Sequence, residues 1–151
     1  MKKILYIDMD NVLVDFPTGI AALSEELKEA YKGNYDETPG IFSLMQPMKG
    51  AVEAVNALAE HYDIYVLSTA PWRNPSAWSD KLEWVQKYFG KEENSLLYKR
   101  LIFSHHKDLN RGDYLVDDRT KNGAENFQGE LILFGSETYP DWDHVVRRLL
   151  H

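Results

Sequence analysis

The sequence contains no cysteine, which limits both its folding and its chemistry. Without thiols it can form neither disulfide bonds nor thiolate metal sites. It also lacks any apolar run of about 18 residues, so no membrane-spanning helix is predicted. Only the four apolar residues Ile4–Ile7 separate Lys3 from Asp8, too few for the core of a signal peptide. A cytoplasmic location is therefore the default expectation.

Basic side chains are outnumbered, with 17 Lys and Arg against 24 Asp and Glu and a formal net charge of −7. This balance argues against binding to polymeric nucleic acid or to an anionic membrane. A small anionic substrate stays compatible, because a metal ion and one or two basic side chains can reverse the local field. The 151 residues are enough for one globular domain.

Short apolar strands alternate with helical segments, which is typical of an α/β fold built on a parallel sheet. Helices are predicted at about 50–61, at 74–90 and from Pro140 onward; Asn74-Pro75 is a helix start and Gly90 a helix end. We expect a Rossmann-like parallel sheet with helices between its strands. The predicted strands are 4–7, 64–67, 101–103, 114–116 and 131–134.

Residues 17–46 interrupt this alternation. A helix is predicted over 20–31, followed by a polar, glycine-containing loop at 32–40. Because the segment follows directly after the first strand, it is a candidate lid over a site there. The alternative is an ordinary crossover helix with a long loop. The expected division is a catalytic core of 1–16 and 47–151 with a small helical cap at 17–46.

The first strand ends in two carboxylates, Asp8 and Asp10, two residues apart. In a sheltered site such a pair does not stay fully ionised without a cation or a shared proton. The carboxyl edge of an open α/β sheet is also where ligands bind. The pair therefore predicts a divalent metal ion or a shared proton, the alternative being an acidic pair that caps a helix.

Three further strand ends carry polar side chains, namely Ser68-Thr69, Lys107 and Asp117-Asp118. In a doubly wound sheet these ends meet at one edge. Mg²⁺ prefers carboxylate and carbonyl oxygens, and a hydroxyl, an ammonium and Mg²⁺ together suit a transferring phosphoryl group. Taken singly, Thr69 fits a turn residue and Lys107 a solvated lysine, so the set as a whole carries the prediction of phosphoryl transfer with Mg²⁺.

These motifs resemble the four motifs of the haloacid dehalogenase superfamily, and several segments are similar to its 5′(3′)-deoxyribonucleotidase family. The resemblance covers most of the chain except about 17–46. It implies a haloacid dehalogenase-like fold and Mg²⁺-dependent hydrolysis of (deoxy)nucleoside 5′- or 3′-monophosphates through an aspartyl-phosphate. The matching segments are Asp8–Phe16, Gly50–Val55, Thr69–Pro71, Trp84–Gly90, Leu115–Arg119 and Pro140–Val145.

The resemblance also implies roles. Asp8 would be the nucleophile, and Asp10 would protonate the leaving alkoxide and then activate water. Thr69 would bind a phosphoryl oxygen, with Ser68 a weaker candidate, while Lys107 would neutralise nucleophile and phosphate.

The metal ligands implied by the resemblance are Asp8, the backbone carbonyl of Asp10, and the pair Asp117 and Asp118. Asp118 is the expected direct ligand, with Asp117 orienting water and Lys107, although the choice within the pair stays open.

Substrate contacts are expected from three residues. Phe16 matches an aromatic at the nucleotide pocket, and Phe42 is a candidate for base stacking, with burial under the lid as the alternative. Arg73 is a candidate for the phosphate or sugar, with a surface role as the alternative. Asn11 and Ala70 depart from the family, which usually has Gly and Ser there.

Other interpretations stay open. The same chemistry could serve a sugar phosphate, a small metabolite or a nucleic-acid 3′-phosphate end. A phospho-receiver module would need an acidic strand end in mid-chain, where Ser68-Thr69 stands. A non-catalytic member of the fold is a further alternative.

The expected partner is a small phosphomonoester, and a homodimer is one option for the assembly. His105-His106 is interpreted as loop, and Trp78, Trp84 and Trp142 as core.

Overall fold

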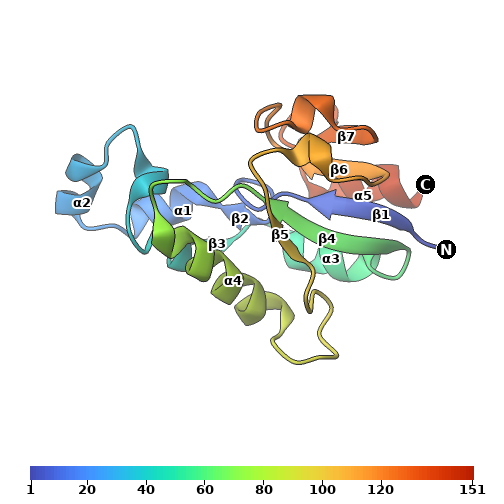
Figure 1. The fold of residues 1–151 in the computed structure, drawn as a ribbon, viewed down its shortest axis with the longest axis horizontal. Coiled ribbons are helices and arrows are strands. Elements are labelled where there is room, and N and C mark those ends of the chain that lie inside the picture. The colour runs from blue at the N-terminus through green and yellow to red at the C-terminus, as the bar shows by residue number, and fades with distance from the viewer.

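The computed structural model describes residues 1–151 and contains a five-stranded parallel sheet (Figure 1). The strand order is β5-β4-β1-β6-β7, so the core strands, counted along the chain, run three-two-one-four-five. This is the Rossmann-type order, whereas a receiver fold runs two-one-three-four-five. The predicted α/β fold is confirmed and the receiver alternative is excluded. The strands are β1 (Lys3–Ile7), β4 (Tyr62–Ser68), β5 (Leu101–Phe103), β6 (Tyr114–Asp117) and β7 (Glu130–Leu133).

The two faces of the sheet are covered unequally. Leu5 and Ile7 point into the main core beneath three helices, whereas Tyr6 points to the opposite face and a smaller cluster with Phe127. On that second face the connections after β5 and β6 contain only short 3₁₀ turns, so the helices expected between these strands are absent. The elements are α3 (Ala51–Leu58), α4 (Pro75–Phe89), α5 (Trp142–Leu150), η3 (Lys107–Leu109) and η4 (Ala124–Asn126).

The buried face of α4 differs from the prediction. Trp84 is buried as expected, and so is Trp142 on α5, but Trp78 and Leu82 are 37% and 45% exposed. Lys81 takes a place on the buried face because its ammonium finds anionic and carbonyl partners there. The prediction that Trp78 belongs to the core is therefore wrong.

The segment after the first strand forms two short helices, α1 (Phe16–Ala21) and α2 (Glu25–Ala30), so the single helix predicted over 20–31 is also wrong. Ser24 lies between them in an extended conformation, and its side chain accepts a hydrogen bond from the backbone N–H of Leu27 at 3.2 Å. This cap starts a new helix instead of continuing the first.

Two short antiparallel strands, β2 (Val14–Asp15) and β3 (Gln46–Pro47), hold the ends of the insertion together. Between them, η1 (Tyr35–Glu37) and η2 (Ile41–Ser43) follow α2, and η2 packs on α4. The insertion lies beyond the carboxyl ends of β1 and β4 (Figure 1). Ile41 belongs to the main core, so the insertion shares its hydrophobic interior with the sheet domain.

No helix has the length and apolar character needed to cross a lipid bilayer.

Candidate active site

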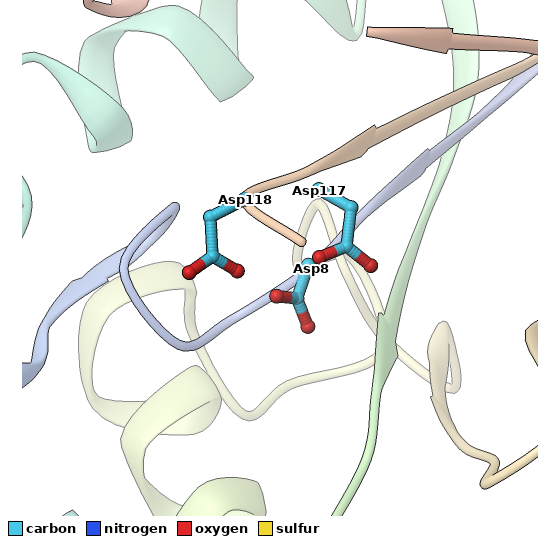
Figure 2. A group of neighbouring side chains, drawn as sticks. All are labelled: Asp8, Asp117 and Asp118. Carbon is cyan, nitrogen blue, oxygen red and sulfur yellow. The ribbon is translucent and has the colours of Figure 1, made fainter. Parts of the chain in front are cut away.

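The site begins where β1 and β6 end side by side, which is the point at which the strand order changes direction. The backbone N–H of Asp8 donates to the carbonyl of Val116 at 2.9 Å, so the first acid is aligned with the end of β6. Asp117 and Asp118 follow there. Figure 2 shows the three carboxylates converging, and one oxygen of each lies within 4.8 Å of the others.

Lys107 lies in η3 and is buried between two of these acids. Its ammonium donates to Asp8 Oδ1 at 3.0 Å and to Asp117 Oδ2 at 2.6 Å. Burial alone would lower the pKa of Lys107, but Asp8 and Asp117 together raise it above the ordinary value. The lysine is therefore held as a cation beside Asp8.

The backbone of Lys107 is held in place because the turn at Asn122 and Gly123 packs closely against η3. The N–H of Lys107 donates to the carbonyl of Asn122 at 2.7 Å. Gly123 follows with φ at +86°, and a Cβ there would lie 2.8 Å from the backbone nitrogen of Lys107. Only glycine fits this left-handed position without moving η3.

Two carboxyl groups of the cluster, those of Asp117 and Asp118, have raised pKa values. Burial, followed by the charge of Asp8, raises the pKa of Asp117 to about 6 and that of Asp118 to about 8. Asp117 has both oxygens occupied, by Lys107 and by the N–H of Arg119 at 3.1 Å. Asp118 Oδ1 is buried without a hydrogen-bond partner. Because this free oxygen lies in a cluster with surplus negative charge, the site fits a hard divalent cation.

Asp10 turns away from this cluster toward α4. Lys81 is fully buried, and its ammonium lies 3.3 Å from the Asp10 carboxylate, 2.7 Å from Ser68 Oγ and 3.0 Å from the carbonyl of Thr69. Burial raises the pKa of Asp10, and the charge of Lys81 opposes that effect. The spacing of the apolar residues on α4 gave no sign of this lysine.

The turn after Asp10 explains one departure from the family. Asn11 has φ at 60°, in the left-handed region where glycine is usual and asparagine is tolerated. Its Oδ1 accepts from the N–H of Phe16 at 3.3 Å, so the side chain links the turn to the start of α1.

A cavity of about 610 Å³ opens above the acids, a volume suited to a small organic ligand. Among the predicted site residues, Asp10, Phe16, Thr69 and Asp118 line it. In this structure the Thr69 hydroxyl donates to the carbonyl of Ser104 at 2.7 Å, so it must rotate before it can donate to a phosphate.

Six of the ten predicted site residues are absent from this lining. Asp8, Lys107 and Asp117 form the charged cluster with Asp118, whereas the other three lie elsewhere. Ser68 is buried, and its hydroxyl accepts from Lys81, so it is not placed to bind phosphate. Phe42 is only 2% exposed, with the Lys81 ammonium 4.6 Å from its ring centroid, so the buried alternative holds and base stacking does not. Arg73 is exposed but lies outside the cavity lining.

Several lining residues were not predicted. Tyr35 comes from the insertion, and Arg119 directly follows Asp118. Trp72 and His105 also line the cavity, and His106 is exposed, so the histidines form no metal pair. The only signal in the sequence was position, because each unpredicted residue adjoins a strand-end motif or lies in the insertion.

The sequence of this chain matches a known protein family. A family model described as 5′ nucleotidase, deoxy (pyrimidine), cytosolic type C protein matches residues 22–148. A protein of Vibrio phage KVP40, provisionally described as a 5′(3′)-deoxyribonucleotidase, is 60% identical over 98% of this chain and 85% of its own. A protein of Staphylococcus epidermidis with the same description is 38% identical over 74% of this chain and 58% of its own.

Solved structures share the fold at low identity. A haloacid dehalogenase-type hydrolase of Bacillus subtilis, crystallised with magnesium, superposes with a TM-score of 0.63 at 11% identity, covering 98% of both chains. A haloacid dehalogenase superfamily hydrolase of Geobacter sulfurreducens gives 0.61 at 13% identity, covering 98% of this chain and 96% of its own.

Proposed function

Because this chain belongs to the 5′(3′)-deoxyribonucleotidase family of haloacid dehalogenase-like hydrolases, we propose that it hydrolyses nucleoside or deoxynucleoside monophosphates with Mg²⁺. The observation that carries the proposal is the buried contact of Lys107 with Asp8 beside a cavity that also exposes Asp10 and Asp118. Nucleophile, cation and acid thus lie together at one edge of the sheet.

In the first step, Asp8 attacks the phosphorus atom and the bond from phosphorus to the leaving oxygen breaks, which gives an aspartyl-phosphate. Lys107 donates hydrogen bonds to Asp8 and to Asp117, so the position of its ammonium group is set before substrate binds. A fixed cation beside the attacked phosphoryl group stabilises charge that develops in the transition state.

Asp10 supplies the proton that the leaving oxygen needs. Its carboxyl lines the cavity, and burial raises its pKa, which favours the protonated form before attack. In the second step the resulting carboxylate takes a proton from the water that attacks the aspartyl-phosphate. Lys81 holds this carboxyl in place from the opposite side, and we regard it as a positioning residue.

The acids Asp8 and Asp118, with the backbone carbonyl of Asp10, would hold the Mg²⁺ ion, and Asp117 would keep Lys107 in place. When bound, the ion supplies charge neutralisation for the phosphoryl oxygens. The unpartnered oxygen of Asp118 and the raised pKa values of Asp117 and Asp118 support this assignment.

The insertion 17–46 would face the leaving group. Phe16, directly before the insertion, and Tyr35 within it line the cavity, so both are candidates for sugar and base contacts. A cytoplasmic location and a small-molecule phosphomonoester partner fit this activity.

The test is phosphate release from 5′- and 3′-monophosphates, ribo and deoxy, beside sugar phosphates, each with Mg²⁺ and with EDTA. We expect Mg²⁺-dependent turnover concentrated on nucleotides. Turnover of sugar phosphates alone would retain the chemistry and reject the nucleotide substrate. No turnover on a folded, Mg²⁺-loaded protein would reject the proposed activity.

A further inference from the structure

Trp72 is the most exposed aromatic side chain near the site, with 82% of its surface open, although it lines the catalytic cavity. Trp84 and Trp142 are buried, whereas the large apolar ring of Trp72 is left in water at the rim of a cavity. This placement suggests that a ligand covers the ring.

The ring is supported from one side by other aromatic side chains. Trp72 meets His105 edge to face, with centroids 6.0 Å apart, and His105 lies 6.3 Å from Trp78. Trp78 in turn packs edge to face on Phe103 of β5 at 5.2 Å. This series, which we call the aromatic row (Trp72, His105, Trp78 and Phe103), links the exposed ring to the sheet.

Trp72 lies at a distance from the predicted phosphate contact Thr69 that suits contact with the base of a nucleotide. It follows Thr69 by three residues, and three residues of chain reach at most about 11 Å. In a nucleoside monophosphate one sugar separates the phosphate from the base, which is a span of similar size. Phe42 is buried in the core, and among the aromatic side chains that line the cavity Trp72 has the most exposed ring.

We propose that Trp72 is a specificity-determining residue whose indole face stacks on the nucleobase of the substrate. The assignment rests on the proposed nucleotidase activity and adds how the base is recognised. Stacking uses the flat face shared by all bases, so it selects nucleotides over base-free phosphates and discriminates weakly among bases.

The experiment compares thymidine 5′-monophosphate with 2-deoxyribose 5-phosphate, which carries the same sugar and phosphate without a base. We expect Trp72→Ala to lower the ratio of kcat/KM values, nucleotide over sugar phosphate, about tenfold, the size of one stacking contact. Trp72→Phe, which keeps a flat ring, should retain most of that ratio, whereas Trp72→Leu, which keeps only apolar bulk, should lose it.

An unchanged ratio in Trp72→Ala would overturn the assignment, whether neither substrate is affected or both lose activity equally, since an equal loss indicates a structural role. A wild-type protein inactive on the nucleotide would instead contradict the proposed function. Tryptophan fluorescence then tests Trp72 independently of turnover, with thymidine as the probe. Quenching that disappears in Trp72→Phe supports stacking, and no quenching in the wild type overturns it.

Discussion

The two ends of the candidate active site are built in different ways. The phosphate end (Asp8, Lys107, Asp117 and Asp118) comes from strand ends and a tight turn, and ion pairs at 2.6 and 3.0 Å hold its lysine. The leaving-group end (Phe16, Tyr35 and Trp72) consists of partly or largely exposed rings from the start of α1, from the insertion and from the loop after β4. The residues proposed for the chemistry are thus buried or half-buried at strand ends and in a tight turn, whereas the side chains proposed to choose the substrate keep part of their surface open to the cavity.

The largest effect is expected from Asp8→Asn, which removes the proposed nucleophile at the phosphate end. The amide has nearly the same shape but is a poor nucleophile, so we expect a loss of about 10⁴-fold or more in kcat with the fold retained. Phosphate release and circular dichroism check this. Asp143→Asn, on the exposed face of α5, is the matched control. Turnover near that of the wild type in Asp8→Asn would contradict the covalent mechanism.

Lys81→Met tests whether the buried lysine positions Asp10, the proposed general acid. Methionine keeps the length of the side chain but removes the contacts with Asp10, Ser68 and the carbonyl of Thr69. Because a misplaced general acid slows chemistry more than binding, we expect kcat to fall about 100-fold while KM changes little. Lys87→Met, on the exposed part of the same helix, is the control. A kcat like that of the wild type would rule out positioning by Lys81.

A comparison of two arginines sharpens the description of the cavity. Arg119 lines it and Arg73 does not. We therefore expect Arg119→Ala to raise KM about tenfold and Arg73→Ala to change it by less than about threefold, in the range of one charge-assisted hydrogen bond. Steady-state kinetics on the preferred substrate measures both. The reverse order of effects would show that substrate lies outside the described cavity.

The smallest expected effect is on stability. Since the folded-state pKa values of Asp117 and Asp118 lie near 6 and 8, above their ordinary value of 3.8, folding favours their protonated forms. Their contribution to stability is present below about pH 4 and is lost as pH rises through 6 and 8. Without metal, we expect Tm to fall by a few degrees over this range.

Mg²⁺ should reverse that fall, because it replaces the protons as the source of positive charge. Thermal unfolding with EDTA and with Mg²⁺ at several pH values measures the effect, and Asp118→Asn should weaken both dependences. A Tm in EDTA that rises from pH 4 to 8, or one insensitive to Mg²⁺ at pH 8, would contradict the description of the cluster.

The sequence was sufficient to predict the sheet and the phosphate end. Apolar runs that end in acids, a hydroxyl or a lysine are local patterns, and the parallel topology brings such ends together. Hence Asp8, Lys107 and Asp117 were placed at one edge before any contact was known, and the structure brings them within hydrogen-bonding distance.

The parts that could not be predicted depend on long-range contacts. Lys81 stands between two polar or exposed positions, and nothing local in the sequence indicates that it is buried. It is buried because Asp10 and Ser68, distant in sequence, provide partners. Phe42 looked equally suited to stacking or to burial, and its packing against Phe16 at 5.9 Å decided the outcome. Removing 17–46 would also remove Ile41 and Phe42 from the main core, so point variants test the insertion better than a deletion.

The most direct test of the account is detection of the covalent intermediate on Asp8. Asp10→Asn lacks the base that activates water, so it should slow hydrolysis of the aspartyl-phosphate. It also lacks the acid of the first step, so the substrate here is p-nitrophenyl phosphate, whose p-nitrophenolate leaves without a proton. After rapid acid quench of this variant with Mg²⁺ and p-nitrophenyl phosphate, mass spectrometry should find one added phosphoryl group on the peptide that contains Asp8. The Asp8→Asn,Asp10→Asn double variant should show none. Turnover by the wild type with no phosphoryl group on that peptide in Asp10→Asn, or a phosphoryl group at another residue, would contradict the account.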